Sequence, residues 1–422
     1  MARSSFYKML LMESYSDEEL EIIANLAMEE EISTSHGRPK KRRTFIRRDR
    51  LQAGEDLFRD YFAEPPIYHH KYFRRRFRMS HDLFCRIQYA VEAKDPYFVQ
   101  KRDGSQRLGL TSLQKITTAF RMLTYSVTAD FMDEYLKIGE TTVVKSLKRF
   151  VQAIISIFSE QYLRSPNNED IARLLAEGKN RGFPGMLGSI DCMHWKWKNC
   201  PTSWQGMYSG HYHEPTIILE AVASYDLWIW HAFFDLSGSH NDINVLERSF
   251  IFSDLAQGRV PPVNYTVNGH NYNMGYYLAD GIYPQWATFV KTISSPQGNK
   301  RKHFAAAQES ARKDVERAFG VLQARFAIVR GPARFWKLET LKNIMMTCVI
   351  LHNMIVKDER TNNIEEDFEY EQLNEPLEPV TLGATNDFSE FIRRHHFIRD
   401  RKTHSQLQLD LVENLWQLHS EA

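Results

Sequence analysis

Residues 186–197 read MLGSIDCMHWKW, and this apolar run, interrupted by Asp191, decides the predicted fold. The run predicts a short buried strand with Asp191 at its end. Residues 276–284, YYLADGIYP, repeat the pattern, because an aromatic and apolar run ends at Asp280 before a Gly and a Pro. Ligand groups on open α/β sheets gather beyond the carboxyl ends of the strands. We therefore expect Asp191 and Asp280 to lie close together.

A third acidic residue, Glu316, lies in residues 310–326, SARKDVERAFGVLQARF. Apolar residues recur there at spacings of four, three and four, which predicts an amphipathic helix. Like charges held together raise one another's pKa unless a cation neutralises them. Mg²⁺ and Mn²⁺ prefer oxygen ligands, and two such ions about 3.5–4 Å apart can clamp a phosphodiester. The three acids therefore predict a metal-binding cluster suited to phosphoryl transfer.

The motifs around these acids resemble those of a known family. Asp191 in GSIDCMHW, Asp280 in ADGIYP and Glu316 in RKDVERAFGVLQARF resemble the DDE triad of PIF/Harbinger transposases, most closely the plant branch. Thirty-five residues separate the last two acids, a spacing found in many DDE enzymes. GSHNDINVLERS at 238–249 and CVILHNMIV at 348–356 resemble further segments of the family. The resemblance extends from about residue 51 to residue 357.

The resemblance implies an α/β fold with a ribonuclease H-like mixed sheet flanked by helices, preceded by an all-α helix-turn-helix-like domain. It implies a metal-dependent DNA transposase or endonuclease that cuts DNA at transposon ends and joins the freed 3′ ends to target DNA. Asp191, Asp280 and Glu316 would hold two divalent ions, Mg²⁺ or Mn²⁺. The implied partners are the terminal repeats, the target site and a Myb-like helper protein, and we expect a homo-oligomer in the nucleus. The alternative is a domesticated, catalytically silent transposase that acts as a DNA- or chromatin-associated interaction protein.

The composition of the 422 residues, 43% of them hydrophobic, is that of a globular protein rather than a disordered one. Four scattered cysteines give no disulfide framework, and no Cys-x-x-Cys pair organises Cys192 and Cys200 with the nearby histidines into a zinc site. No apolar run reaches the length that spans a bilayer, and the start lacks a signal-peptide core. We therefore expect a soluble intracellular protein without a membrane partner.

The net charge of +1 conceals a segregation of charge along the chain. Residues 17–31 form a predicted acidic amphipathic helix, and a basic run follows that contains Lys40, Lys41, Arg42 and Arg43. Such a run indicates a nuclear-import signal or an arm that binds DNA phosphates. A solvated linker is the alternative.

Four regions are predicted along the chain: a largely flexible region at 1–50, a helical DNA-binding domain at 51–180, the nuclease domain at 181–357, and an acidic linker with a helical tail at 358–422. Residues 108–160 contain three helical patterns with short breaks, which suits a helix-turn-helix or an ordinary helical bundle. Thr111 or Ser112 can cap the first of these helices. In the first case the third helix would present Lys145, Lys148 and Arg149 to DNA.

Residues 216–226 and 228–238 are two β-rich runs that meet at Asp226 and Leu227. They predict a hairpin that adds to the first strand.

Two further groups are expected near the acids. Lys300, Arg301 and Lys302 would hold the DNA strand beside the metals, or else lie in a solvated loop. Asp242 is interpreted as a helix cap with its carboxylate near the site, and the alternative is an auxiliary acid near the metals. Arg312 and Arg317 flank Glu316 and are interpreted as facing DNA phosphates, with pairing to Glu316 as the alternative for Arg312.

Overall fold

The computed structural model describes residues 46, 48–210, 213–249, 263–364 and 398–421. The predicted acidic helix at 17–31 and the basic run with Lys40, Lys41, Arg42 and Arg43 lie outside these residues. The described chain divides into two compact units that interleave along the sequence. The first contains the described residues up to Glu160, with Trp195–Ile217 and Leu322–Leu351; the second contains Gln161–His194, Ile218–Val321 and the described residues from His352 onward. The four predicted regions stay a prediction.

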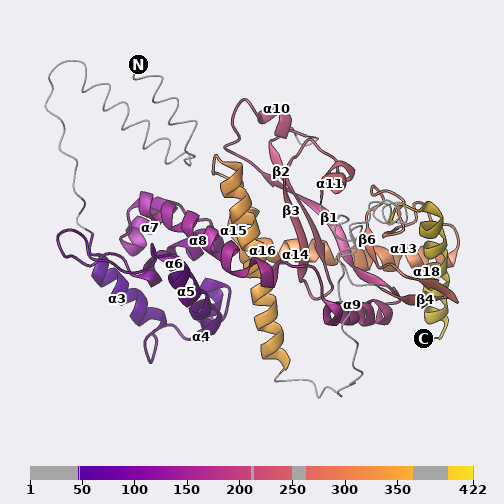
Figure 1. Ribbon diagram of the computed structural model, residues 1–422, viewed down its shortest axis with the longest axis horizontal. Helices are drawn as coiled ribbons and strands as arrows, with labels where there is room; N and C mark the ends of the chain where they lie inside the picture. Colours follow the sequence, from indigo (N-terminus) through magenta and orange to yellow (C-terminus); the bar gives the residue numbers. More distant parts are fainter. Residues whose placement is uncertain (1–45, 47, 211–212, 250–262, 365–397, 422) are drawn as a thin grey trace, which may run out of the picture. The chain divides into compact units, whose positions relative to one another are not determined.

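Helices and strands alternate after an all-helical beginning (Figure 1). In chain order the elements are α3 (Arg50–Tyr61), α4 (His70–Phe77), α5 (His81–Lys94), α6 (Ser112–Tyr125), α7 (Ala129–Leu136), α8 (Glu140–Tyr162), α9 (Asn168–Asn180), β1 (Met186–Lys196), α10 (Gln205–Tyr208), β2 (Thr216–Ala223), β3 (Ile229–Ser237), α11 (Asp242–Arg248), β4 (Tyr265–Val267), β5 (His270–Tyr272), β6 (Tyr276–Ala279), β7 (Phe289–Lys291), α13 (Asn299–Arg312), α14 (Asp314–Arg325), α15 (Ala327–Arg330), α16 (Leu338–Ile364) and α18 (Arg401–Glu421). None of the helices in these described stretches has both the length and the apolar character that crossing a membrane requires.

The N-terminal helices form because their ends are capped and one face of each is apolar. The side chain of Ser80 accepts a hydrogen bond from the Leu83 amide at the start of α5, and Thr111 forms a capping box with Gln114 at the start of α6. Aromatic rings fill the space between the helices, with Phe120 packed 5.2 Å from Phe84 between ring centroids. The three helices predicted within 108–160 are present as α6, α7 and α8.

The main sheet in the described part of the chain has five strands in the order β3-β2-β1-β6-β7 (Figure 1). β1 pairs in parallel with β6, and β6 pairs in parallel with β7. Only a short turn connects β2 to β3, as the predicted hairpin requires, so these two neighbours run antiparallel. The sheet is therefore mixed and flanked by helices, after an N-terminal helical region, which is the predicted ribonuclease H-like layout.

Successive residues of a strand point to opposite faces of the sheet, and each face of this sheet packs against a separate core. The position of a residue in β1 therefore indicates which core its side chain faces. One core contains Leu278 and Val290 together with Phe304 of α13 and Leu411 of α18. The opposite core contains Ala279 and Phe289 with residues such as Ile190, Val222 and Leu246. Helices α13 and α18 lie side by side (Figure 1), so the predicted C-terminal tail docks on its own protein.

One local prediction was wrong in extent, and one of the alternatives was wrong. β1 continues to Lys196, so Asp191 lies inside the strand and not at its end. The residues from Asn299 to Arg312, for which a solvated loop was the alternative, form helix α13. Their alanines and the buried Phe304 give this segment the apolar face that packs on the sheet.

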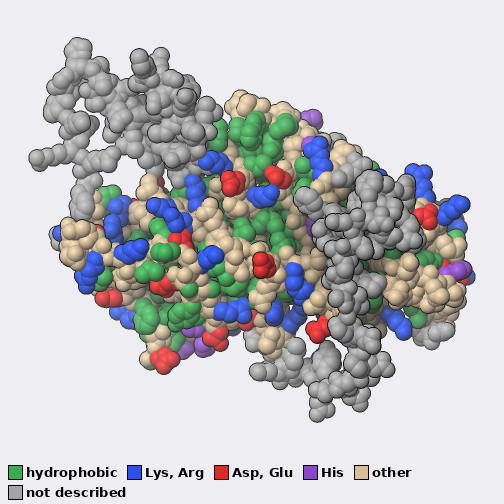
Figure 2. Space-filling model, viewed as in Figure 1, with side chains coloured by type: hydrophobic (Ala, Val, Ile, Leu, Met, Phe, Trp, Pro, Cys, Tyr) green, Lys and Arg blue, Asp and Glu red, His purple; other side chains and the backbone are tan. Residues whose placement is uncertain are grey.

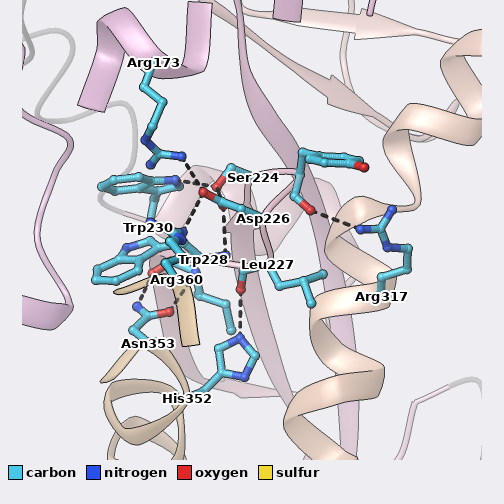
Figure 3. Close-up of polar contacts among 12 residues, drawn as sticks. Arg173, Ser224, Asp226, Leu227, Trp228, Trp230, Arg317, His352, Asn353 and Arg360 are labelled. Carbon is cyan, nitrogen blue, oxygen red and sulfur yellow. Dashed lines mark hydrogen bonds and ion pairs between the residues drawn. The ribbon is translucent and has the colours of Figure 1, made fainter. Parts of the chain in front are cut away.

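Asp226 organises the turn between β2 and β3 (Figure 3). Its carboxylate accepts hydrogen bonds from the Ser224 hydroxyl and the Trp228 amide, and it forms ion pairs with Arg173 of α9 and Arg360 of α16. Burial raises the pKa of Asp226, but Arg360, Ser224 and Arg173 together hold it below its ordinary value. The charged form of Asp226 is thus the one that the fold stabilises.

We predict a pH-dependent loss of stability for Asp226→Asn. A carboxylate whose pKa is lowered by folding stabilises the protein above its unfolded pKa, and this contribution disappears as the pH falls through the folded pKa. The variant should lose about 1–2 kcal/mol of unfolding free energy at neutral pH, and much less below about pH 4. Urea denaturation at both pH values measures the difference. An equal deficit at the two pH values would contradict the prediction, and Asp82→Asn, at a fully exposed side chain, is the control.

Candidate functional site

Asp191 sits on the face of β1 that packs against α13. Two residues earlier on the same face, the Ser189 hydroxyl donates to the Ala311 carbonyl of α13. The Asp191 carboxylate accepts the amide N–H of Cys192 at 2.8 Å and lies 3.5 Å from Nη1 of Arg312, the last residue of α13. Asp191 is largely buried, so helix and strand together fix its position.

Arg312 brings Asp191 and Glu316 together. The same Nη1 atom lies 3.5 Å from Oδ2 of Asp191 and 3.1 Å from Oε1 of Glu316. Those two carboxylate oxygens are therefore at most about 6.6 Å apart, the sum of the two distances. Glu316, in the first turn of the predicted helix, α14, is 44% exposed and so accessible to a ligand. Of the two interpretations of Arg312, pairing with Glu316 is confirmed.

Asp280 directly follows β6, the strand next to β1, and is level with Asp191 when the register of the two strands is extended. β1 and β6 are paired with Ser189 opposite Leu278. Two residues further along both chains, this register places Asp280, which directly follows β6, beside Asp191. Asp280 is exposed, and its carboxylate accepts the amide N–H of Gly281. Thus the register relates Asp280 to Asp191, and Arg312 relates Asp191 to Glu316.

The environment of Asp191 disfavours its negative charge. The pKa of Asp191 is raised to about 6, mainly by burial and also by the nearby acids Asp242 and Glu316, against the opposing effects of the Cys192 amide and Arg312. A carboxyl group with this pKa is half protonated in mildly acidic solution. An added cation would favour the ionised form, as in the metal sites that the sequence predicts.

Asp242 is one of the charged residues around Asp191 and is not a helix cap, so the cap interpretation was wrong. Asn241 is the N-cap of α11, because its side chain accepts the Asn244 amide. Asp242, one residue later, accepts a hydrogen bond from Cys192. Burial raises the pKa of Asp242, and the charges of Asp280 and Glu220 contribute to the rise. A fourth acid therefore stands within electrostatic reach of the predicted site.

Glu220, in the middle of β2, was missed by the sequence analysis. Its side chain is fully buried, and neither carboxylate oxygen has a hydrogen-bond partner among the described residues. Nε2 of His231 on β3 lies 3.4 Å from it. The sequence did contain a signal, a single acid within the apolar segment TIILEAVA. An acidic side chain is seldom fully buried unless it is paired, so its place in such a segment is unusual.

The basic residues Lys300, Arg301 and Lys302 lie on the first turn of α13, at the opposite end of this helix from Arg312. Twelve residues of helix rise separate Lys300 from Arg312, about 18 Å. Lys300 Nζ also pairs with the Glu413 carboxylate of α18 at 2.6 Å. The structure thus places this group along the helix from Asp191 and Glu316 rather than beside them.

The three basic residues of α8 differ in their surroundings. Arg149 donates two hydrogen bonds of 3.0 Å to the Asp95 carboxylate, and its guanidinium lies 5.3 Å from the centre of the Tyr97 ring. Lys145 is exposed, with its Nζ 5.6 Å from the centre of the same ring, and Lys148 is half-buried. On the face that Figure 2 shows, Lys and Arg side chains over the N-terminal helices are interspersed with acidic and hydrophobic ones.

Arg317, which was weighed as a phosphate contact, has a structural role instead. Its guanidinium donates to the Asp314 carboxylate and to the Tyr225 carbonyl at 3.0 Å in the turn after β2 (Figure 3). This contact ties α14, which carries Glu316, to the hairpin.

The donor chemistry of the site fits a hard divalent cation. Asp191, Asp280 and Glu316 offer only carboxylate oxygens, the ligands that Mg²⁺ and Mn²⁺ prefer. Within the described ranges, however, no three His, Cys, Asp or Glu side chains are placed to hold one ion together. Mg²⁺ sites commonly use one or two protein carboxylates with waters and substrate phosphates, so the pair related by Arg312 is compatible with this chemistry.

Comparison with known families identifies part of the chain. Residues 160–363 match a family model described as plant transposon protein, and this segment, a little under half of the chain, contains all three acids. Residues 54–92 match a model described as a domain of unknown function. Neither a curated protein nor a solved structure matches the chain. The family match confirms the resemblance to a plant-type transposase and does not specify the Harbinger branch.

Proposed function

We propose that this protein is a metal-dependent DNA transposase and endonuclease. The proposal starts from the match of residues 160–363 to the plant transposon protein family. The observation that carries the proposal is the sharing of Arg312 Nη1 by Asp191 and Glu316, with Asp280 at the same level of the neighbouring strand. Three acids far apart in the sequence are thereby linked, two through one guanidinium group and the third through strand register. A stability role does not require this arrangement, since each acid alone would be more favourable in solvent.

In the proposed reaction Asp191, Asp280 and Glu316 would hold two divalent ions against a DNA phosphodiester. When bound, such ions supply Lewis-acid stabilisation of the attacking and leaving oxygens. The protein's part is to position its carboxylates, and the bound cations would favour their ionised forms. Arg312 orients Asp191 and Glu316, and the Cys192 amide fixes the rotation of the Asp191 carboxylate. Water would attack the phosphodiester at the transposon end and release a 3′ hydroxyl. That hydroxyl would then attack a phosphodiester of the target DNA and displace its 3′ oxygen.

The remaining partners are part of the same proposal. They are DNA terminal repeats and target sites, a Myb-like helper protein and further copies of this chain, in the nucleus. Three basic side chains are exposed and would provide positive charge for contacts with DNA phosphates: Lys145, Arg301 and Lys302. The catalytically silent alternative shares these partners and differs only in the chemistry, so an activity assay separates the two.

We predict that the protein nicks or cleaves DNA only with a divalent ion and that Asp280→Asn abolishes this activity. Several kcal/mol of charge stabilisation depend on the ion, so we expect a loss on the order of a thousandfold. Supercoiled DNA, with and without transposon ends and helper protein, is incubated with Mg²⁺, Mn²⁺ or EDTA and resolved on a gel.

The matched control is Glu169→Gln, which removes one exposed carboxylate from α9 and should leave cleavage unchanged. Cleavage that persists in EDTA or in Asp280→Asn would refute the proposed chemistry. Binding of DNA without any cleavage would favour the silent alternative.

A further inference from the structure

A hollow of about 390 Å³ opens on the first unit, among α3, α4, α6 and α7. Aromatic side chains make up much of its wall, and three of them are unusually exposed: Tyr125 at 39%, Phe131 at 51% and Tyr135 at 42%. Phe131 and Tyr135 are stacked on one face of α7, with ring centroids 6.3 Å apart and planes 24° apart. We call this hollow the aromatic pocket. Exposed rings gathered at a hollow mark a binding surface more often than scattered single ones do.

Two guanidinium groups are built into the same wall. Arg121, 8% exposed, donates a 2.8 Å hydrogen bond from Nη1 to the Arg76 carbonyl. The Arg76 guanidinium lies 3.9 Å from the centre of the Tyr68 ring and donates to the Tyr61 hydroxyl. These contacts hold both guanidinium groups in place, and none of the contacts involves a carboxylate. The pocket therefore repels a further cation and suits a flat ligand that carries negative charge.

The charge around the pocket extends this preference. Arg75 is exposed on α4, and its carbonyl accepts from the Tyr125 hydroxyl at 3.4 Å. Arg78, just past the end of α4, lies 5.5 Å from the centre of the Tyr125 ring. The wall contains one acid, Asp60, whose pKa is raised by burial while Arg59 and Arg76 oppose the rise. Among the residues that line the pocket, two arginines therefore face one acid.

We propose that the aromatic pocket binds an unstacked base of single-stranded DNA, with the α4 arginines on the adjoining phosphates. Aromatic platforms beside a basic surface are the general means of binding single-stranded nucleic acid, since every base has a π-face. A base inside an intact duplex is already stacked and cannot enter. The inference rests on the proposed function only in taking DNA as the substrate. It adds a place for the strand that is opened near the cut, on the helical unit.

Phe131→Ala tests the proposal, because Phe131 is the most exposed ring of the wall and its removal leaves no cavity in the core. A fluorescent single strand of about ten nucleotides is titrated with the full chain in EDTA and followed by anisotropy. We expect Phe131→Ala to weaken binding about 5- to 100-fold, and Phe131→Trp to bind like the wild type. The control, Tyr89→Ala, removes a 71% exposed ring on α5 and should have no effect.

The duplex form of the same sequence discriminates between occupants. Its affinity should be nearly equal in Phe131→Ala and wild type, because its bases are stacked. Unchanged single-strand affinity in Phe131→Ala, or an equal loss for duplex and single strand, would overturn the proposal; a peptide site remains in the first case. Since no metal is present, these results are independent of cleavage: a variant that cleaves normally but binds single strands weakly retains the proposed function.

Discussion

Asp191→Asn is expected to abolish metal-dependent cleavage and, at the same time, to stabilise the metal-free protein at neutral pH. The first effect follows because a neutral amide is a poor ligand for a hard cation, and the loss should again be on the order of a thousandfold. The second follows from the pKa of Asp191, which burial raises from 3.8 to about 6. The folded protein thus binds the Asp191 proton more tightly than the unfolded chain does.

A raised pKa fixes the sign of the pH dependence. The contribution of Asp191 to stability is fully present below the unfolded pKa and is lost as the pH rises through about 6. At neutral pH the ionised carboxylate therefore destabilises the fold by up to about 3 kcal/mol, which asparagine removes while still accepting the Cys192 amide. We expect a gain of about 1–3 kcal/mol in unfolding free energy, measured by urea denaturation in EDTA, that vanishes below about pH 4.

Glu316→Gln is the informative comparison for Asp191→Asn. Glu316 is 44% exposed, so its replacement should abolish cleavage without a comparable gain in stability. If Asp191→Asn retained cleavage, Asp191 would not be a metal ligand. If it lost cleavage but also lost stability, its carboxylate would have a structural role through Arg312.

Asn353→Ala is expected to produce the largest loss of stability. The fully buried Asn353 of α16 accepts the Ile229 amide at 2.9 Å and donates to the Ile229 carbonyl at 2.7 Å (Figure 3). It also donates to the Tyr162 carbonyl at 2.7 Å. Ile229 begins β3, the strand at the end of the sheet order, whose outer backbone groups lack a further strand within the described residues. Alanine would leave three buried backbone groups unpaired, and we expect a loss of about 3–5 kcal/mol of unfolding free energy.

A matched asparagine separates this effect from the loss of any amide. Asn414→Ala removes a single 3.1 Å hydrogen bond to the Gly182 carbonyl from a half-buried position, and should reduce the unfolding free energy by about 1 kcal/mol. Urea denaturation of both variants at neutral pH measures the two losses. Equal losses of unfolding free energy would mean that the hydrogen bonds of Asn353 to the edge of β3 contribute no more than the single bond of Asn414.

Local patterns in the sequence predicted most of the elements that carry the site. Apolar spacing predicted the helix of Glu316, and its Val315 and Leu322 are fully buried. A polar turn between two β-rich runs predicted the β2–β3 hairpin, and Thr111 or Ser112 was expected to cap a helix that Thr111 does cap. These features depend on neighbours within a few residues, so a single sequence contains their cause.

Contacts between distant residues could not be predicted in the same way. The sharing of Arg312 by Asp191 and Glu316 needs the end of α13 to meet the middle of β1, and the pKa of Asp191 depends on its burial there. The contact of the buried Glu220 with His231 and the aromatic pocket likewise join side chains from separate elements. The sequence by itself determined which residues form strands and helices and which acids carry the transposase-like motifs. Only the tertiary structure decided which of them meet, because register, burial and charge pairing are properties of elements brought together by folding.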